Sequence, residues 1–183
     1  MKQPTIGARY EQRTVYMNDS GIDLQIWDLS GQKLFQSLVP MYTRTADFVA
    51  ILYDITSSYS ALFTTKGVLD KESFENLQKW IEIMKNGAQK DEIVALVANK
   101  LDLEVQRYDF ICYAHYFFHS NRVITTEEGK AVAAKHEFLF REISAKSGEN
   151  IRDLMRDMLM RFTEQLAKPS KIEVHLKKTQ LDL

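Results

Sequence analysis

Residues 93–102 read IVALVANKLD, an apolar run of six residues that ends in a polar cluster. The run is rich in β-branched side chains, which is typical of a strand buried on both faces of a sheet. Residues 48–53 form a second run of this kind and residues 138–143 a third. Because helical patterns lie between the runs, the sequence predicts an α/β fold with an open, mostly parallel sheet covered by helices on both faces.

Other local patterns in the sequence predict a hairpin and three helices. Residues 14–17 and 22–27 alternate as strands around the turn-forming segment 18–21, which predicts a hairpin. Apolar residues at helical spacing form one face within 74–84 and another within 151–166. Thr125 and Glu128 have the spacing of a capping box, so a further helix is expected to begin there.

The composition describes a soluble globular protein. The chain has 183 residues with 45% hydrophobic and 27% charged residues and a net charge of −1, so nucleic acid is a poor candidate for a partner. A single cysteine, Cys112, excludes an intrachain disulfide and fits a reducing, cytoplasmic setting. No apolar run reaches the length of a membrane span.

Three polar clusters follow predicted strands: residues 28–32, 99–102 and 144–146. Ligands of open α/β sheets bind beyond the carboxyl ends of the strands, so these clusters are expected to surround a ligand. Each cluster alone has an ordinary explanation, since Asn99 and Asp102 suit a polar turn and Asp28 suits a helix N-cap.

Taken in order, Asp-x-x-Gly-Gln, Asn-Lys-x-Asp and Ser-Ala-Lys resemble the signature of the small GTPases of the Ras superfamily. Further segments are similar to the Rab branch in particular: Trp27-Asp28, Asp54-Ile55-Thr56, Ser73–Leu77 with Trp80, and Glu127–Gly129. The resemblance implies a P-loop-type small GTPase fold and a switch that binds and hydrolyses GTP, with GTP/GDP and Mg²⁺ as ligands. It also implies a GTPase-activating protein, an exchange factor, effector proteins and a role in vesicle traffic.

Guanine recognition is assigned by this resemblance to the second and third clusters. The Asp102 carboxylate can accept two hydrogen bonds from one edge of guanine, a pair of donors that adenine does not offer. The resemblance implies that the stem of Lys100 lies along the base, that Asn99 ties neighbouring loops together, and that the Ala145 N–H meets the guanine oxygen. Ser144 and Lys146 complete the Ser-Ala-Lys motif.

The first cluster corresponds by resemblance to the phosphate end of the site. Thr5 would ligate Mg²⁺ through its hydroxyl, Asp28 would hold the metal through water, and the Gly31 N–H would bond the γ-phosphate. Gln32 would orient the attacking water, a task in which positioning dominates. Ser30 stands where Rab proteins usually have alanine.

The phosphate-binding motif Gly-x-x-x-x-Gly-Lys-Ser/Thr occurs nowhere in the 183 residues. Because this loop precedes the switch threonine in the family, we expect the first strand and first helix of the fold to be missing. Losing four or five buried large side chains represents on the order of 10 kcal/mol, against a total stability of about 5 to 15 kcal/mol. Weak nucleotide binding is therefore expected, and a nucleotide-free pseudo-GTPase acting as a protein-binding module is the alternative.

Two insertions interrupt the resemblance, at about 57–70 and 108–122. We interpret both as translated introns, a hypothesis that transcript reads crossing them without a gap would defeat. Cys112, His115 and His119 in the second insertion could bind zinc, although three ligands make this a weak alternative. A Rho-type protein also has an insertion in this region, but that one is charged and helical whereas this one is aromatic.

The domain prediction is an incomplete GTPase domain at 1–166 and a tail at 167–183. The tail contains no cysteine for prenylation, so we expect a cytoplasmic protein, with peripheral endomembrane association only if the native C-terminus differs.

Overall fold

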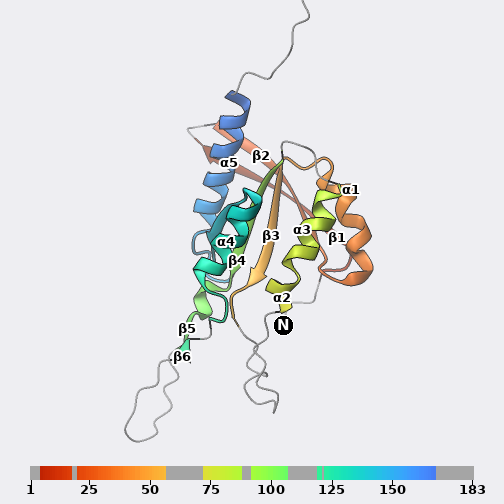
Figure 1. Cartoon of the computed structure of the whole chain (residues 1–183). Helices are drawn as coiled ribbons and strands as arrows, with labels where there is room; N and C mark the ends of the chain where they lie inside the picture. The colour runs from red at the N-terminus through yellow and green to blue at the C-terminus, as the bar shows by residue number, and fades with distance from the viewer. Residues whose placement is uncertain are drawn as a thin grey trace, which may run out of the picture.

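A three-stranded parallel sheet forms the centre of the fold in our computed structural model (Figure 1). The structure describes residues 5–17, 20–56, 72–87, 92–106, 119–120 and 122–167. The strands are β3 (Phe48–Asp54), β4 (Ile93–Asn99) and β7 (Leu139–Glu142), in the order β3-β4-β7. Residues 93–98 of the middle strand are all buried, which confirms the sequence prediction of a strand covered on both faces.

A long hairpin forms a second sheet. Strands β1 (Ala8–Met17) and β2 (Ser20–Leu29) pair antiparallel, with Val15 opposite Ile22 and Ala8 opposite Leu29. Both strands are longer than the sequence predicted. Within the described residues, no strand bridges β2 and β3, so the hairpin and the parallel sheet are separate sheets.

Helices cover both faces of the parallel sheet, as predicted. They are α2 (Glu72–Glu75), α3 (Leu77–Lys85), α4 (Thr126–His136) and α5 (Ile151–Ala167). One buried cluster joins β3 and β4 to α3 and α4, and it includes Tyr53, Leu77, Leu96 and Ala133. The other joins the opposite face of β4 to α5, and it includes Ala95, Val97, Leu154 and Met158. The prediction of an α/β fold is confirmed.

The helix predicted over 74–84 is interrupted, because Asn76 is not helical and separates α2 from α3. On α5 the predicted apolar face extends too far: Leu166 is 70% exposed. Short elements were missed because they are too short for a periodic signal. They are η1 (Lys33–Leu38), α1 (Val39–Thr43), η3 (Leu101–Leu103), β5 (Val105–Gln106) and β6 (His119–Ser120).

Helix α4 begins with the predicted capping box. The Thr125 hydroxyl accepts a hydrogen bond from the Glu128 N–H at 3.1 Å, and the Glu128 carboxylate accepts one from the Thr125 N–H at 2.8 Å. These bonds satisfy two backbone donors that the first helical turn leaves free. The helix ends at Glu137, whose φ of 60° is left-handed and turns the chain into β7.

Insertion 57–70 lies outside the described residues, as does most of 108–122 and nearly all of the tail. None of the helices in the described ranges combines the length and apolar character needed to cross a bilayer.

Candidate functional site

Two of the predicted clusters meet because β4 and β7 are parallel neighbours. The Ile143 N–H donates to the Ala98 carbonyl at 2.8 Å, and the Leu101 N–H donates to the Ile143 carbonyl at 3.0 Å. The loops that follow the two strands therefore leave the sheet side by side, at its carboxyl edge. This backbone pairing depends on the register of strands separated by about 40 residues, which sequence alone does not give.

Side chains lock these two loops together. The Ser144 hydroxyl donates to Asp102 Oδ1 at 2.7 Å, and the Ala145 N–H donates to Asn99 Oδ1 at 3.0 Å. The Lys146 ammonium lies 3.7 Å from Asp102 Oδ2. The resulting cavity has a volume of about 270 Å³ and is lined by Asn99, Lys100, Asp102, Leu103, Ala145 and Lys146. Asp102 thus presents a partly buried carboxylate to a small concave site.

The first cluster lies at the carboxyl end of β2. The Thr5 hydroxyl donates to Asp28 Oδ2 at 2.7 Å, so the predicted metal-binding oxygens are adjacent. The Ser30 N–H donates to the Gly7 carbonyl at 2.9 Å, which ties this segment to the one that contains Thr5. A Cβ added at Gly31 would meet nothing within 4 Å, so the side-chain position of this residue faces open space.

Ser30 is buried, with 4% of its surface exposed. Its hydroxyl oxygen accepts the Gln32 N–H at 3.3 Å. The hydroxyl that distinguishes this segment from the usual alanine therefore lies against the backbone of the predicted catalytic glutamine, while Gln32 itself is exposed at the start of η1.

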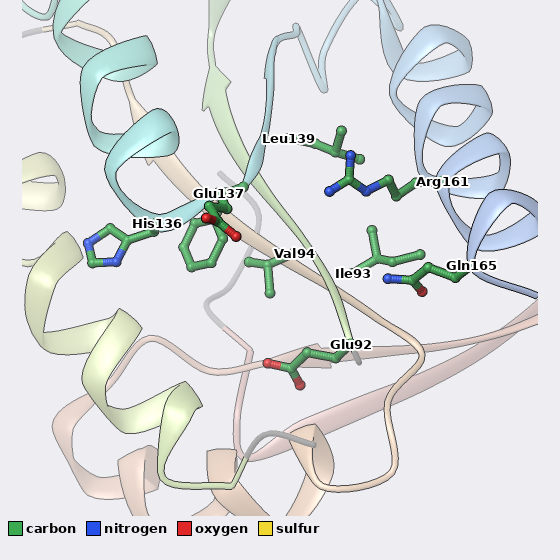
Figure 2. Close-up of a pocket in the computed structure, with 9 residues that line it drawn as sticks. Glu92, Ile93, Val94, His136, Glu137, Leu139, Arg161 and Gln165 are labelled. Carbon is green, nitrogen blue, oxygen red and sulfur yellow. The ribbon is translucent and has the colours of Figure 1, made fainter. Parts of the chain in front are cut away.

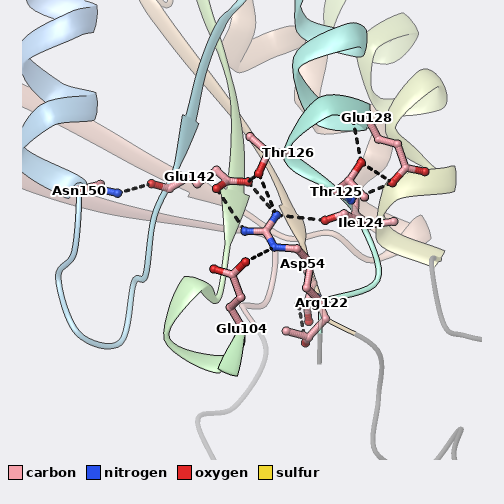
Figure 3. A network of polar contacts seen from close by, with 10 residues as sticks. Asp54, Glu104, Arg122, Ile124, Thr125, Thr126, Glu128, Glu142 and Asn150 are labelled. Carbon is pink, nitrogen blue, oxygen red and sulfur yellow. Dashed lines mark hydrogen bonds and ion pairs between the residues drawn. The ribbon is translucent and has the colours of Figure 1, made fainter. Parts of the chain in front are cut away.

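A network of polar contacts surrounds Arg122 (Figure 3). Arg122 Nε donates to Glu104 at 2.7 Å, and its two terminal nitrogens donate to the two Glu142 oxygens at 2.8 and 3.1 Å. Asn150 donates to the Glu142 carbonyl at 2.9 Å. Because Glu142 directly precedes Ile143 and Ser144, this network fixes the end of β7 from which the loop containing Ser144, Ala145 and Lys146 begins.

Arg122 keeps its charge although it is partly buried. Burial by itself lowers the pKa of its guanidinium, but the hydrogen bonds that it donates to the Glu142 and Glu104 carboxylates, together with their charges, raise the pKa above its ordinary value. The sequence interpretation assigned no role to Arg122, Glu104 or Glu142. The available signal was the position of Glu142 at the end of a predicted strand.

Asp54 was also missed, although it ends β3 as Asn99 ends β4. The two residues are register partners, and the Asp54 carboxylate forms an ion pair with the Lys100 ammonium. Its position at the carboxyl end of a strand was the signal that could have identified it.

A second cavity, of about 260 Å³, lies where β4 and β7 begin and is shown in Figure 2. Arg161 and Gln165 of α5 lie on one side of it, and Glu137 and Glu92 on the other. Burial raises the pKa of Glu92 to about 7. Since this cavity is at the amino ends of the strands, it is remote in the fold from the three predicted clusters.

The donor atoms at Thr5 and Asp28 suit a hard cation. No group of three or more His, Cys, Asp and Glu side chains with metal-binding geometry occurs in the described part of the chain. The zinc candidates Cys112, His115 and His119 have side chains outside it. The Thr5 hydroxyl and Asp28 carboxylate are oxygen ligands of the kind that Mg²⁺ prefers, so these residues fit that ion.

A parallel sheet with an Asn-Lys-x-Asp loop bonded to a Ser-Ala-Lys loop at its carboxyl edge defines a nucleotide-binding α/β protein of the small GTPase class. A family model described as the Ras family matches residues 1–164, and the chain belongs to this family. Membership implies a guanine-nucleotide switch that works with regulator and effector proteins.

Proposed function

We propose that the chain is a Rab-like GTPase switch that acts in membrane traffic. The observation that carries the proposal is the joining of Asp102 to Ser144 and of Asn99 to Ala145, which builds a cavity of about 270 Å³ at the carboxyl edge of the sheet. An ordinary polar turn after β4 would not require a second loop, 42 residues further along the chain, to complete its hydrogen bonds.

Selectivity for guanine would come from Asp102. Its carboxylate is mostly covered, with 17% of the side chain exposed, and it can accept the ring N–H and the exocyclic amine of guanine. Adenine would leave this carboxylate facing an acceptor, and such an unpaired buried group discriminates strongly. Ala145 lines the same cavity, but its N–H donates to Asn99 Oδ1 at 3.0 Å, so it would meet the guanine oxygen only by sharing or releasing that hydrogen bond.

At the phosphate end, Thr5 and Asp28 would hold Mg²⁺, which neutralises charge on the phosphates when bound. The Gly31 N–H would bond the γ-phosphate, and no neighbouring group occupies the side-chain position of this residue. Gln32 would orient the attacking water, and the Ser30 hydroxyl would restrain the backbone from which Gln32 projects.

Effector recognition is supported by an exposed aromatic surface beside these segments. The Trp27 ring lies 4.9 Å from that of Tyr10 and 5.0 Å from that of Tyr42, measured between centroids. Tyr10 and Trp27 remain 44% and 48% exposed. Exposed aromatic clusters are typical anchors of protein interfaces, and Trp27 directly precedes Asp28 in β2.

The second candidate function is a nucleotide-free module that binds proteins through the same aromatic surface. It is favoured by the absence of a phosphate-loop motif from the 183 residues, because the backbone cradle and lysine of that loop supply most contacts to the β- and γ-phosphates. For the same reason we propose that this chain binds guanine nucleotides only weakly. We also propose a cytoplasmic location.

Titration of the 183-residue chain with fluorescent GDP and ADP, in the presence of Mg²⁺, tests these proposals. We expect saturable binding of GDP, weaker than submicromolar, and none of ADP. Asp102→Asn should transfer the preference from guanine to xanthine, because the asparagine amide donates to the C2 carbonyl that replaces the guanine amine. Asp23→Asn on the hairpin is the matched control and should change nothing.

Absence of GDP binding in this titration would favour the nucleotide-free module. Submicromolar affinity would instead contradict the proposal of weak binding.

A further inference from the structure

The carboxyl ends of β3 and β4 bring together two side chains of opposite charge. Asp54 and Asn99 are register partners in the parallel sheet, so Lys100 follows directly beside Asp54. The Lys100 ammonium pairs with Asp54 Oδ2, and Lys100 lines the cavity that also contains Asp102. The Asp54 side chain is thus linked to the cavity through Lys100, and Asp54 is not itself among the lining residues.

The Asp54 carboxylate is a fixed anion. Its Oδ1 accepts the Thr56 N–H at 2.8 Å and the Thr56 hydroxyl at 2.7 Å, and the Asp54 N–H donates to the Ser73 hydroxyl at 3.1 Å. Figure 3 shows Asp54 beside the network around Arg122. Because one carboxylate oxygen is held in this way, the other is held in place as the acceptor for the Lys100 ammonium.

The backbone of Lys100 is fixed as well. Its φ of 73° lies in the left-handed region, which is uncommon for a residue with a side chain, and its N–H donates to Asn99 Oδ1 at 2.8 Å. With the backbone and the ammonium both held, the four-carbon stem between them loses much of its freedom. A flexible lysine would otherwise have to be ordered when a ligand arrives, at a cost in side-chain entropy.

We propose that Asp54 is a positioning residue of the guanine site, which holds Lys100 so that its aliphatic stem forms one wall of the base cavity before the nucleotide binds. This inference rests on the proposed function, since it assigns a task in the same site. Asp54 does not contact the base edge that Asp102 reads, so it would raise the affinity for a purine nucleotide without changing the choice of base.

A purely structural role for Asp54 is the competing explanation, in which the carboxylate only closes the turn to Thr56. Asp54→Asn separates the two roles. The asparagine carbonyl oxygen can still accept both hydrogen bonds from Thr56, but the charge that holds the Lys100 ammonium is lost. Asp54→Ala removes both interactions.

The test measures GDP and inosine diphosphate affinities for the full chain and for both variants. We expect Asp54→Asn and Asp54→Ala to weaken both ligands alike, by roughly fivefold, which corresponds to the loss of a partly exposed ion pair. The ratio of the two affinities should stay constant, whereas Asp102→Asn should change it. Asp47→Asn, at the opposite end of β3, should leave both affinities unchanged.

The results separate failure of the Asp54 inference from failure of the proposed function. If the wild-type chain binds GDP and Asp54→Asn binds it equally well, Asp54 has only its structural role and the inference fails while the proposed function stands. If the wild-type chain binds neither ligand, the proposed function fails. A changed ratio of GDP to inosine diphosphate affinity would place Asp54 in base selection and would contradict positioning.

The ion pair can be tested without a nucleotide by NMR relaxation of the lysine side chains. The ε-carbon of Lys100 should be more restrained than that of Lys146, whose side chain is 81% exposed. Asp54→Asn should make the two alike. Equal mobility in the wild-type chain would overturn the inference irrespective of the binding results.

Discussion

Arg122 offers the sharpest test of how the candidate site is supported. Its side chain is only 12% exposed, and Glu142, which it contacts with two parallel hydrogen bonds, is 18% exposed. Replacing Arg122 by methionine would keep much of the apolar volume and leave a mostly covered carboxylate without its cation. Breaking a buried pair in this way costs about 3 to 5 kcal/mol.

Because both side chains retain some contact with solvent, we expect the lower end of that range, about 3 kcal/mol. This is a large part of an ordinary domain stability of about 5 to 15 kcal/mol. Urea unfolding followed by the fluorescence of Trp27 and Trp80 measures the loss. Glu142→Gln and the double variant complete a thermodynamic cycle, whose coupling energy isolates the pair from the other contacts of Arg122.

Arg156→Met is the matched control. Arg156 pairs with Asp153 one turn away on α5, and the two side chains are 60% and 37% exposed. Such surface pairs contribute about 0.5 kcal/mol or less. If Arg122→Met cost no more than this control, the network around Arg122 would not stabilise the loop after β7, and the reasoning would be wrong.

Three further predictions concern other parts of the fold. Thr125→Ala should lower the free energy of unfolding by about 1 kcal/mol, because it removes the capping box. Glu127→Gln, at an exposed position of the same helical turn, is the control, and an equal effect of both changes would contradict the capping role of Thr125. Gly129→Ala should lower the free energy of unfolding by roughly 1 to 3 kcal/mol, because the added Cβ would lie 2.6 Å from the Phe140 ring and would also meet the Tyr53 hydroxyl. The better helix propensity of alanine, about 1 kcal/mol, offsets only part of this cost. A stabilised variant would contradict the prediction, since it would show that the neighbouring side chains can shift to make room for the methyl group. Burial raises the pKa of Glu92 from 4.5 to about 7, so the native state binds this proton more tightly and the free energy of unfolding should fall as the pH rises through that window. The melting temperature should therefore fall less between about pH 5 and about pH 8 for Glu92→Gln than for the wild-type chain. Equal falls would contradict the raised pKa.

Several elements were predictable because their signals are local. The apolar run 93–98 could only be a doubly covered strand or a buried helix segment, and its length and β-branched residues favoured the strand that is observed. The capping box at Thr125 requires only residues three positions apart. The break at Asn76 was not predictable, since the apolar spacing continues through it and only packing on β3 decides where α2 ends.

The sequence alone was sufficient to recognise the three polar motifs in their order, because each is a short string at the end of a recognisable strand. Membership of a guanine-nucleotide family followed from that order. Only the tertiary structure decided which side chains support them. Arg122 meets Glu142 across 20 residues, and Asp54 meets Lys100 across a pair of strands. These partnerships depend on the parallel register of β3, β4 and β7, which long-range burial fixes and no local pattern encodes.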